Sequence, residues 1–384
     1  MNFVGTNAAD CDSIGRENMI MTRRDNISIN RSPKNKGLIR CTVAQVRLAT
    51  IVLLIFFSGS LLGYAADYPQ ATISNGLITA KMYLPDAKNG YYRSTRFDWS
   101  GAVYSLQYKG HNYYGKWFDS VDPKVINWVY RDGKMVNGSC GALDGPVDEF
   151  QVPLGWDEAK PGGTFIKIGV GVLRKTGEKY NRFFPYEVVE TGKWTVQNHK
   201  DSVEFTQVLS DPELGYSYVY RKIVRLVKGK PEMVIERSLK NTGRLEIKSE
   251  VYDHNLLVLD NQPPGPDFTI KFPFQIQTPR PPNKALVDVR GNQIVYMKQL
   301  TGEDQAVVFI QGFSDNAKDS GFVIENSKVG AGMKVSGDRA IIRTFLWSIR
   351  KVLGIEPYIA IDVQPGAEFN WSNTYDYYTL AADK

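Results

Sequence analysis

His254 is the first candidate for acid–base chemistry in this chain. The chain has 384 residues and three histidines. His254 lies in the stretch 251–274, where an apolar, strand-like run gives way to a loop rich in proline. Because the pKa of imidazole lies close to neutral pH, a histidine at a strand end beside a rigid loop can both take and return a proton. The plainer alternative is a histidine that only completes hydrogen bonds at the end of a strand.

Glu356 is the second candidate, in the segment Gly-Ile-Glu-Pro at 354–357. A carboxyl group between an isoleucine and a proline is expected to have a raised pKa, which brings it toward the range in which a general base works. The alternative is that Glu356 is only the polar first residue of a strand.

Arg96 and Trp99, in the segment Arg-Phe-Asp-Trp at 96–99, have the side chains that a sugar site uses. An indole can stack on a pyranose ring, and a guanidinium can bind hydroxyls or a carboxylate. The alternative is a structural pair of Arg96 with Asp98, next to a tryptophan in the core.

Acidic residues supply further candidates. Asp148 and Glu149 are adjacent, and they suit a pair of hydrolytic carboxylates, a pair of calcium ligands or a solvated loop tip, of which we expect the last. Asp260 and Asp267 bracket the proline loop, but their spacing does not match an EF-hand. We count Glu149, Asp267 and Asn255 among the candidate substrate-binding residues, and we predict neither a metal site nor a cofactor.

The first 66 residues are interpreted as a leader. Residues 49–62 form an apolar run that follows Arg40 and Arg47 and precedes small residues, which is the order of a secretory signal peptide. The run is shorter than the roughly 20 residues that a membrane-spanning helix needs. We therefore expect cleavage near Ala65 and Ala66, a periplasmic or secreted protein, and membrane contact only through this segment; an uncleaved anchor is the alternative.

The charge and cysteine content after the leader exclude several classes of protein. Residues 67–384 contain 39 basic and 37 acidic side chains, a balance that does not indicate nucleic-acid binding. Cys140 is the single cysteine in this part, so no internal disulfide can form, and there is no CxxC or HExxH motif for zinc. We expect a monomer or a weak dimer with a mono- or oligosaccharide as its partner.

Hydrophobic alternation predicts strands through nearly all of residues 67–384. Residues 163–174 read as one strand, 194–209 as a hairpin arm, and 216–227 and 233–240 as two strands joined by the turn at 228–231. Residues 117–156 read as irregular, and later strands are expected at 306–313, 321–325, 339–349 and 359–363. No amphipathic helix of three turns is visible. The prediction is an all-β fold, a single large antiparallel β-sandwich over residues 67–384.

Three motifs resemble the aldose 1-epimerase, or galactose mutarotase-like, superfamily. A strand closing on Asn-Thr-Gly at 241–243 is followed by a strand carrying His254, and the segment 354–357 with its Glu-Pro pair precedes a Pro-Gly turn at 365–366. A glycine-containing strand at 99–106 resembles the early strand of these proteins. The three occur in family order.

This resemblance implies a fold and a mechanism. The fold is a large, twisted antiparallel β-sandwich that holds a sugar on a concave face. The activity is mutarotation, in which a base takes the proton of the anomeric hydroxyl and an acid protonates the ring oxygen. Glu356 matches the base and His254 the acid, and we expect the two to face each other a sugar ring apart.

The sequence also departs from the family pattern and leaves other functions open. Asn255, Leu256 and Leu257 follow His254 where the family has aromatic residues, and His111 and His199 read as surface residues rather than as a further active-site histidine. A polysaccharide lyase is one alternative, in which Tyr252, His254 and Asn255 would act together, although strand alternation opposes Tyr252 and Asn255 sharing a face. A non-catalytic carbohydrate-binding protein is the other.

Overall fold

The computed structural model describes residues 68–118, 129–131, 134–137 and 143–381. The chain divides into two units, 1–62 and 63–384, and all the described residues belong to the second. The predicted leader, its expected cleavage point and Cys140 lie outside the described residues. Among those that are described, no helix is long and apolar enough to cross a membrane.

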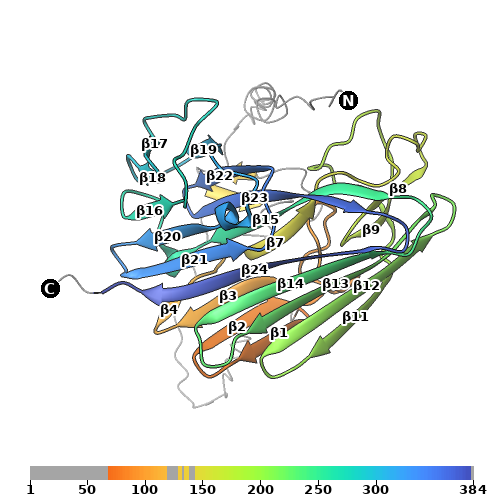
Figure 1. Cartoon of the computed structure of the whole chain (residues 1–384), viewed down its shortest axis with the longest axis horizontal. Coiled ribbons are helices and arrows are strands. Elements are labelled where there is room, and N and C mark those ends of the chain that lie inside the picture. The colour runs from red at the N-terminus through yellow and green to blue at the C-terminus, as the bar shows by residue number, and fades with distance from the viewer. Residues whose placement is uncertain (1–67, 119–128, 132–133, 138–142, 382–384) are drawn as a thin grey trace, which may run out of the picture. The chain divides into compact units, whose positions relative to one another are not determined.

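The described part is all-β, as predicted, and every strand pairing in it is antiparallel (Figure 1). Its regular helices are two short 3-10 turns, η2 (Leu259–Asn261) and η3 (Ala317–Ser320). The largest sheet has ten strands, in the spatial order β11 (Lys193–Asn198), β12 (Ser202–Asp211), β13 (Tyr216–Leu226), β14 (Glu232–Asn241), β24 (Glu368–Thr379), β21 (Ala331–Gly337), β20 (Phe322–Asn326), β16 (Phe268–Lys271), β18 (Gln293–Tyr296) and β17 (Val287–Arg290).

A five-stranded sheet packs on this large sheet and carries both His254 and Glu356. Its order is β19 (Gln305–Ile310), β22 (Arg343–Ile349), β23 (Val352–Val363), β15 (Ile247–Leu257) and β7 (Gly145–Phe150). The smaller sheets are β1 (Gln70–Ser74), β2 (Ile78–Tyr83), β3 (Ala102–Tyr108) and β4 (His111–Asn112); β8 (Thr164–Lys167), β9 (Gly171–Arg174) and β10 (Val188–Glu190); and the hairpin of β5 (Val129–Arg131) with β6 (Lys134–Asn137).

Alternation decides which side chains of each strand enter the core. Val251 and Ile361 of the five-stranded sheet share a buried cluster with Tyr220, Leu239 and Trp371 of the ten-stranded sheet. A second buried cluster joins β1, β2 and β3 to the β12–β14 part of the large sheet. The predicted hairpin of β13 and β14 is confirmed, with Leu226 opposite Met233. Half-buried antiparallel strands of this kind produce the period-two pattern visible in the sequence.

Three strand predictions were wrong. Residues 163–174 form two strands, because the chain turns at Gly169, which has a φ of +79°. Residues 117–156 contain the fully buried strand β7, whose acidic pair masked its strand character. The strand expected at 359–363 starts earlier, at Val352, although Pro357 lacks the N–H that a central strand normally contributes.

A buried charge network connects the two main sheets. Lys222 and Arg237 stand opposite each other on β13 and β14, at inward positions of the ten-stranded sheet. Asp148 of β7 accepts from both, with Lys222 Nζ and Arg237 Nε each 2.9 Å from Oδ2. Asp253 of β15 binds Arg237 at 2.8 Å, and Asp98 binds Lys222 at 3.2 Å. Carboxylates from β7, from β15 and from the segment before β3 therefore hold the two cations of the ten-stranded sheet.

Replacing Lys222 by Met should destabilise the protein by about 3–5 kcal/mol, because it removes the cation paired with buried Asp98 and one of the two cations paired with buried Asp148. The matched control is Arg221→Met, the neighbouring residue on the opposite face of β13, whose exposed pair with Glu204 should be worth less than about 1 kcal/mol. Urea denaturation of both variants measures the difference. Equal losses of stability would contradict the assignment of the network as the contact between the sheets.

Candidate functional site

One face of the five-stranded sheet brings His254 and Glu356 into contact. The pairing of β15 with β23 runs from Tyr252 opposite Tyr358 to Asn255 opposite Ile355, so His254 stands opposite Glu356. The distance from His254 Nε2 to Glu356 Oε1 is 3.3 Å, and the two side chains are 6% and 9% exposed. The two groups therefore lie in direct contact, and the expectation of a gap as wide as a sugar ring was wrong.

Neither residue is at a strand end, contrary to the sequence-based prediction. β15 pairs with β23 on one side and with β7 on the other, and these two ladders extend it to Leu257, before the proline loop. Glu356 is likewise within β23. Central strands are rigid, so this pair has a better-defined geometry than a loop would give it.

The imidazole of His254 lies in a tight and largely apolar setting. Its ring is 6.0 Å from Phe97 and 5.6 Å from Trp347, between ring centroids. A Cβ at Gly354 would lie 2.7 Å from its Nδ1, so only glycine leaves room for the ring there. The Nδ1 atom is buried and has no hydrogen-bond partner among the described residues. Burial lowers the pKa of His254 to about 4, despite the opposing attraction of Glu356.

Glu149 is the centre of a neighbouring cluster on the same face. Its carboxylate accepts from Arg96 Nε at 2.7 Å and from the Tyr252 hydroxyl at 2.5 Å. Arg96 also donates to the Tyr252 hydroxyl, at 2.8 Å. Lys167 and Arg182 complete the cluster, at 3.6 and 3.8 Å from the carboxylate. The three cations thus converge on one buried carboxylate, next to the His254–Glu356 pair.

The electrostatics of this cluster follow from burial and charge. Burial alone would raise the pKa of Glu149, but attraction by Arg182, Arg96 and Lys167 outweighs it and lowers the pKa to about 2. Burial lowers the pKa of Lys167 to about 8, against the attraction of Glu149. The expectation of a solvated loop tip at Asp148 and Glu149 was wrong, because β7 is covered on both faces and the two side chains enter two different charge clusters.

The remaining predicted binding residues lie elsewhere. Asn255 points to the opposite face, where its side chain binds Tyr375 and the Ile355 carbonyl, so strand alternation does separate it from Tyr252. Trp99 is 4% exposed and donates to the Ser94 carbonyl as a core residue. Asp267 is exposed and precedes β16 of the ten-stranded sheet. Arg96 and Glu149 are thus the predicted binding residues that the structure groups near His254.

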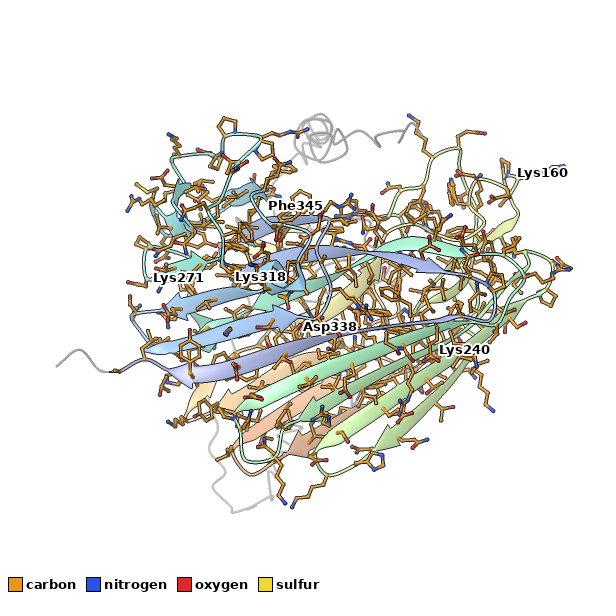
Figure 2. All side chains as sticks on the ribbon, in the orientation of Figure 1. Lys160, Lys240, Lys271, Lys318, Asp338 and Phe345 are labelled. Atoms are coloured by element: carbon orange, nitrogen blue, oxygen red, sulfur yellow. The ribbon has the colours of Figure 1, made fainter. Side chains whose placement is uncertain are left out.

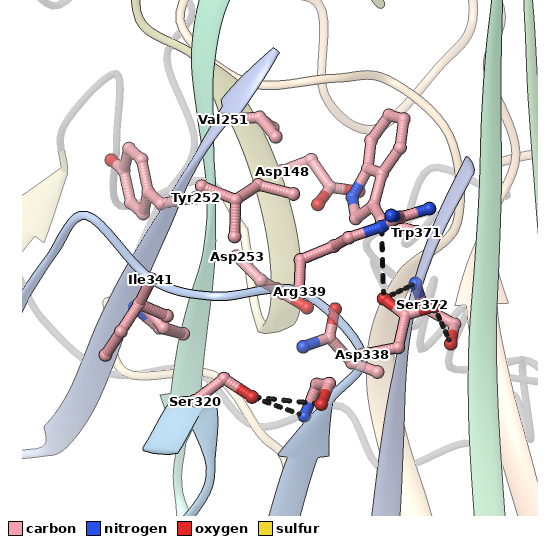
Figure 3. Close-up of a pocket in the computed structure, with 14 residues that line it drawn as sticks. Asp148, Val251, Tyr252, Asp253, Ser320, Asp338, Arg339, Ile341, Trp371 and Ser372 are labelled. Atoms are coloured by element: carbon pink, nitrogen blue, oxygen red, sulfur yellow. Dashed lines mark hydrogen bonds and ion pairs between the residues drawn. The ribbon is translucent and has the colours of Figure 1, made fainter. Parts of the chain in front are cut away.

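A pocket opens on the other side of β15 and β23 (Figure 3). It is lined by Val251 and Asp253 of β15, Pro357 of β23, and Trp371 and Asn373 of β24, among others. Val251 and Asp253 alternate with His254 along β15, and Pro357 follows Glu356 along β23. The pocket therefore lies between the two sheets and does not include the acid–base pair.

The other histidines do not join the site. His199 is exposed, as predicted. His111 was expected at the surface, but it is partly buried. Its side chain is 20% exposed, and its Nδ1 lies 2.7 Å from Asp260 Oδ2. Among the described residues, no group of three or more His, Cys, Asp or Glu side chains could hold a metal ion.

Sequence reasoning missed Lys167, Arg182 and Tyr358. Tyr358 donates to Glu356 Oε2 at 3.0 Å, and Lys167 donates to Tyr180 at 2.9 Å. Lys167 follows Phe165 and Ile166 in a short apolar strand, and a lysine in such a run was the available signal. Arg182 comes from a loop, so only the fold places it.

The low pKa of His254 predicts a loss of stability in acid. The pKa in the folded state, about 4, lies below the ordinary value of 6.5, so the unfolded chain binds this proton more readily. The contribution of His254 to the free energy of unfolding is complete above pH 6.5, the pKa of the unfolded chain. About 2 kcal/mol of this contribution should be lost between pH 7 and pH 5. Urea denaturation at both pH values measures this loss. In His254→Gln the loss should shrink by that amount, whereas His199→Gln should behave as the unmodified protein; an unchanged loss in His254→Gln would contradict the argument.

Comparison with known proteins gives similarity at the level of structure. No protein-family model matches the chain, and no curated protein matches it. A galactose mutarotase related enzyme from Lactobacillus acidophilus is similar with a TM-score of 0.47 and 14% identity, over 82% of this chain and 99% of that one. A galactose mutarotase-like protein from Clostridium acetobutylicum gives a TM-score of 0.48 and 12% identity, over 81% and 95%. A GalM/aldose epimerase homologue from C. elegans gives 0.42 and 13%, over 81% and 99%.

These solved structures bear the name of the superfamily that the sequence motifs resemble. TM-scores below 0.5 and identities this low transfer neither an activity nor a residue role to this chain.

Proposed function

We propose that this protein acts on a sugar at its anomeric centre, with His254 and Glu356 exchanging protons with the substrate and without a cofactor. The observation that supports this most is the 3.3 Å contact between the two side chains on one face of a rigid sheet. The proposal includes export, in keeping with the predicted signal peptide.

The chemistry of mutarotation calls for an acid and a base that are close neighbours. The base takes the proton of the anomeric hydroxyl, the acid protonates the ring oxygen, and the bond between the anomeric carbon and the ring oxygen breaks. Both oxygens are bonded to that one carbon, so the two protein groups must reach atoms that lie only two bonds apart. Rotation of the resulting aldehyde and the reverse proton transfers close the ring in the other anomer.

The protonation of His254 bears on its role. With a pKa of about 4, the imidazole is neutral at pH 7 and must gain a proton before it can donate one as an acid. Glu356 is in hydrogen-bond reach of Nε2, and it is positioned by the hydroxyl of Tyr358. A proton that Glu356 takes from the substrate can thus reach His254 in one short transfer.

A lyase is the second candidate, and the position of Tyr252 favours it. Its hydroxyl lies between Arg96 and Glu149, in the arrangement of a phenol beside a guanidinium that could neutralise a uronate. In that reaction a base removes the proton next to the carboxylate, the glycosidic oxygen leaves with a proton, and a carbon–carbon double bond forms. Its product absorbs in the ultraviolet.

The test is the rate of anomer interconversion, followed by polarimetry with freshly dissolved glucose, galactose and uronic acids. The protein should accelerate the reaction, and His254→Ala and Glu356→Gln should each reduce the acceleration by about 100-fold or more, since each removes one proton-transfer group. His199→Gln, which replaces an exposed histidine, is the matched control and should keep full activity. Absence of acceleration with every monosaccharide would refute the mutarotase proposal, and ultraviolet absorbance with a polyuronate would then establish the lyase.

A further inference from the structure

The buried charge network between the two main sheets has one more carboxylate than it has cations. Asp98, Asp148 and Asp253 face Lys222 and Arg237, and all five side chains are buried. The strongest Coulomb interactions of each of the five are with other members of the network. Three ionised carboxylates and two cations leave a net charge of −1, in an interior where an uncompensated charge is costly.

Two of these carboxylates also have an oxygen atom without a partner. Asp148 and Asp253 stand opposite each other on β7 and β15, and their Oδ2 atoms accept from the cations. Their Oδ1 atoms are buried and have no hydrogen-bond partner among the described residues. In Asp98, by contrast, Oδ1 accepts from the Ser100 N–H and Oδ2 from Lys222. The excess of negative charge and the missing partners thus coincide at Asp148 and Asp253.

The pocket between the sheets is lined by both of these carboxylates (Figure 3). Neutral polar side chains of the same lining already have partners, since Asn373 accepts from Arg237 and Ser320 bonds to main-chain groups. Within the part of the chain that the structure describes, the buried side-chain oxygen and nitrogen atoms of the lining that lack a partner are Asp148 Oδ1 and Asp253 Oδ1. An occupant of this pocket therefore meets two carboxylates that need positive charge.

The size of the pocket limits its occupant. Its volume is about 20 Å³, which is room for one water-sized species, since a water molecule needs roughly 10–15 Å³. A sugar ring does not fit, whereas a potassium or sodium ion does. One positive charge neutralises the network, but a divalent ion would reverse its charge. Divalent ions also favour sites with more carboxylates, and the described residues form no group of three or more His, Cys, Asp or Glu for a metal.

The mouth of the pocket leaves this charge balance unchanged. Asp338 and Arg339 line it just after β21 (Figure 2, with Asp338 labelled), and their side chains are 48% and 45% exposed. Arg339 Nε lies 3.9 Å from Asp338 Oδ1. Because the two charges are opposite and close together, they largely cancel for an ion that enters from solvent.

We propose that this pocket binds one monovalent metal cation, K⁺ or Na⁺, through Asp148 Oδ1 and Asp253 Oδ1, with water completing the coordination. The bound ion neutralises the network and connects β7 to β15 on the side of the sheet that faces the core. This inference does not rest on the proposed function, because it concerns the stability of the protein without a sugar.

A proton is the competing way to remove the charge. Burial raises the pKa of Asp253, which favours its protonated form. A proton on Asp253 supplies no partner for Asp148 Oδ1, however, whereas a cation between the two side chains contacts both unpartnered oxygens. The two explanations differ in what changes stability, since one depends on the metal ion and the other on pH.

The test is the melting temperature, measured by calorimetry in the chlorides of K⁺, Na⁺ and tetramethylammonium at equal ionic strength and pH. Tetramethylammonium screens exposed charges equally but is too large for the pocket. K⁺ or Na⁺ should raise the melting temperature by about 2–4 °C for each tenfold increase in concentration above its Kd, because only the folded state binds the ion.

Asp253→Asn keeps the shape of the side chain and removes the excess negative charge, so it should abolish the dependence on K⁺ and Na⁺. Asp288→Asn is the matched control, a partly exposed carboxylate on β17 outside the network, and should keep the dependence. If Asp253→Asn does not fold, crystals of the unmodified protein in thallium(I) acetate decide. Thallium(I) substitutes for K⁺, and its anomalous signal should lie between Asp148 and Asp253.

Several results would overturn this inference. One is an equal melting temperature in all three salts, and another is an ion dependence that persists in Asp253→Asn or disappears equally in Asp288→Asn. Anomalous peaks of thallium that lie only outside the pocket would also refute it. A melting temperature that responds to pH and not to the metal ion would assign the missing charge to a proton.

Discussion

The contact of Lys222 and Arg237 with Asp98, Asp148 and Asp253 is the constraint on which the rest of this structure depends. Two cations on one sheet are neutralised by carboxylates that come mainly from the other, and all five side chains are buried. Removing either cation would leave one cation for three buried carboxylates. The network therefore specifies how β7 and β15 lie against β13 and β14, more strictly than apolar packing could.

Strands β7 and β15 carry the candidate site on their other face. Asp148 and Glu149 are neighbours in β7, and Asp253 and His254 are neighbours in β15, but each pair divides between the two sides of the sheet. The inward member binds the network, and the outward member belongs to the candidate site. Because a strand alternates with a period of two, holding the inward residues also orients the outward ones.

The site combines a neutral histidine with a strongly ionised cluster. Burial keeps His254 uncharged at neutral pH, whereas the cations around Glu149 keep that carboxylate ionised. Groups with protonation states held apart in this way are typical of sites that move protons.

The sequence by itself determined the all-β class and the hairpin of β13 and β14, and it singled out His254 and Glu356 as candidates, because alternation and rare titratable residues are local signals. It also separated Tyr252 from Asn255. Only the tertiary structure decided that Glu149 is buried, that Arg182 reaches it from a distant loop, and that Asn255 and Trp99 serve the core. The physical reason is that an isolated charged residue in a sequence carries no sign of its partner: Lys222 and Arg237 occupy inward positions that suit apolar residues, and only the carboxylates of another sheet make them stable there.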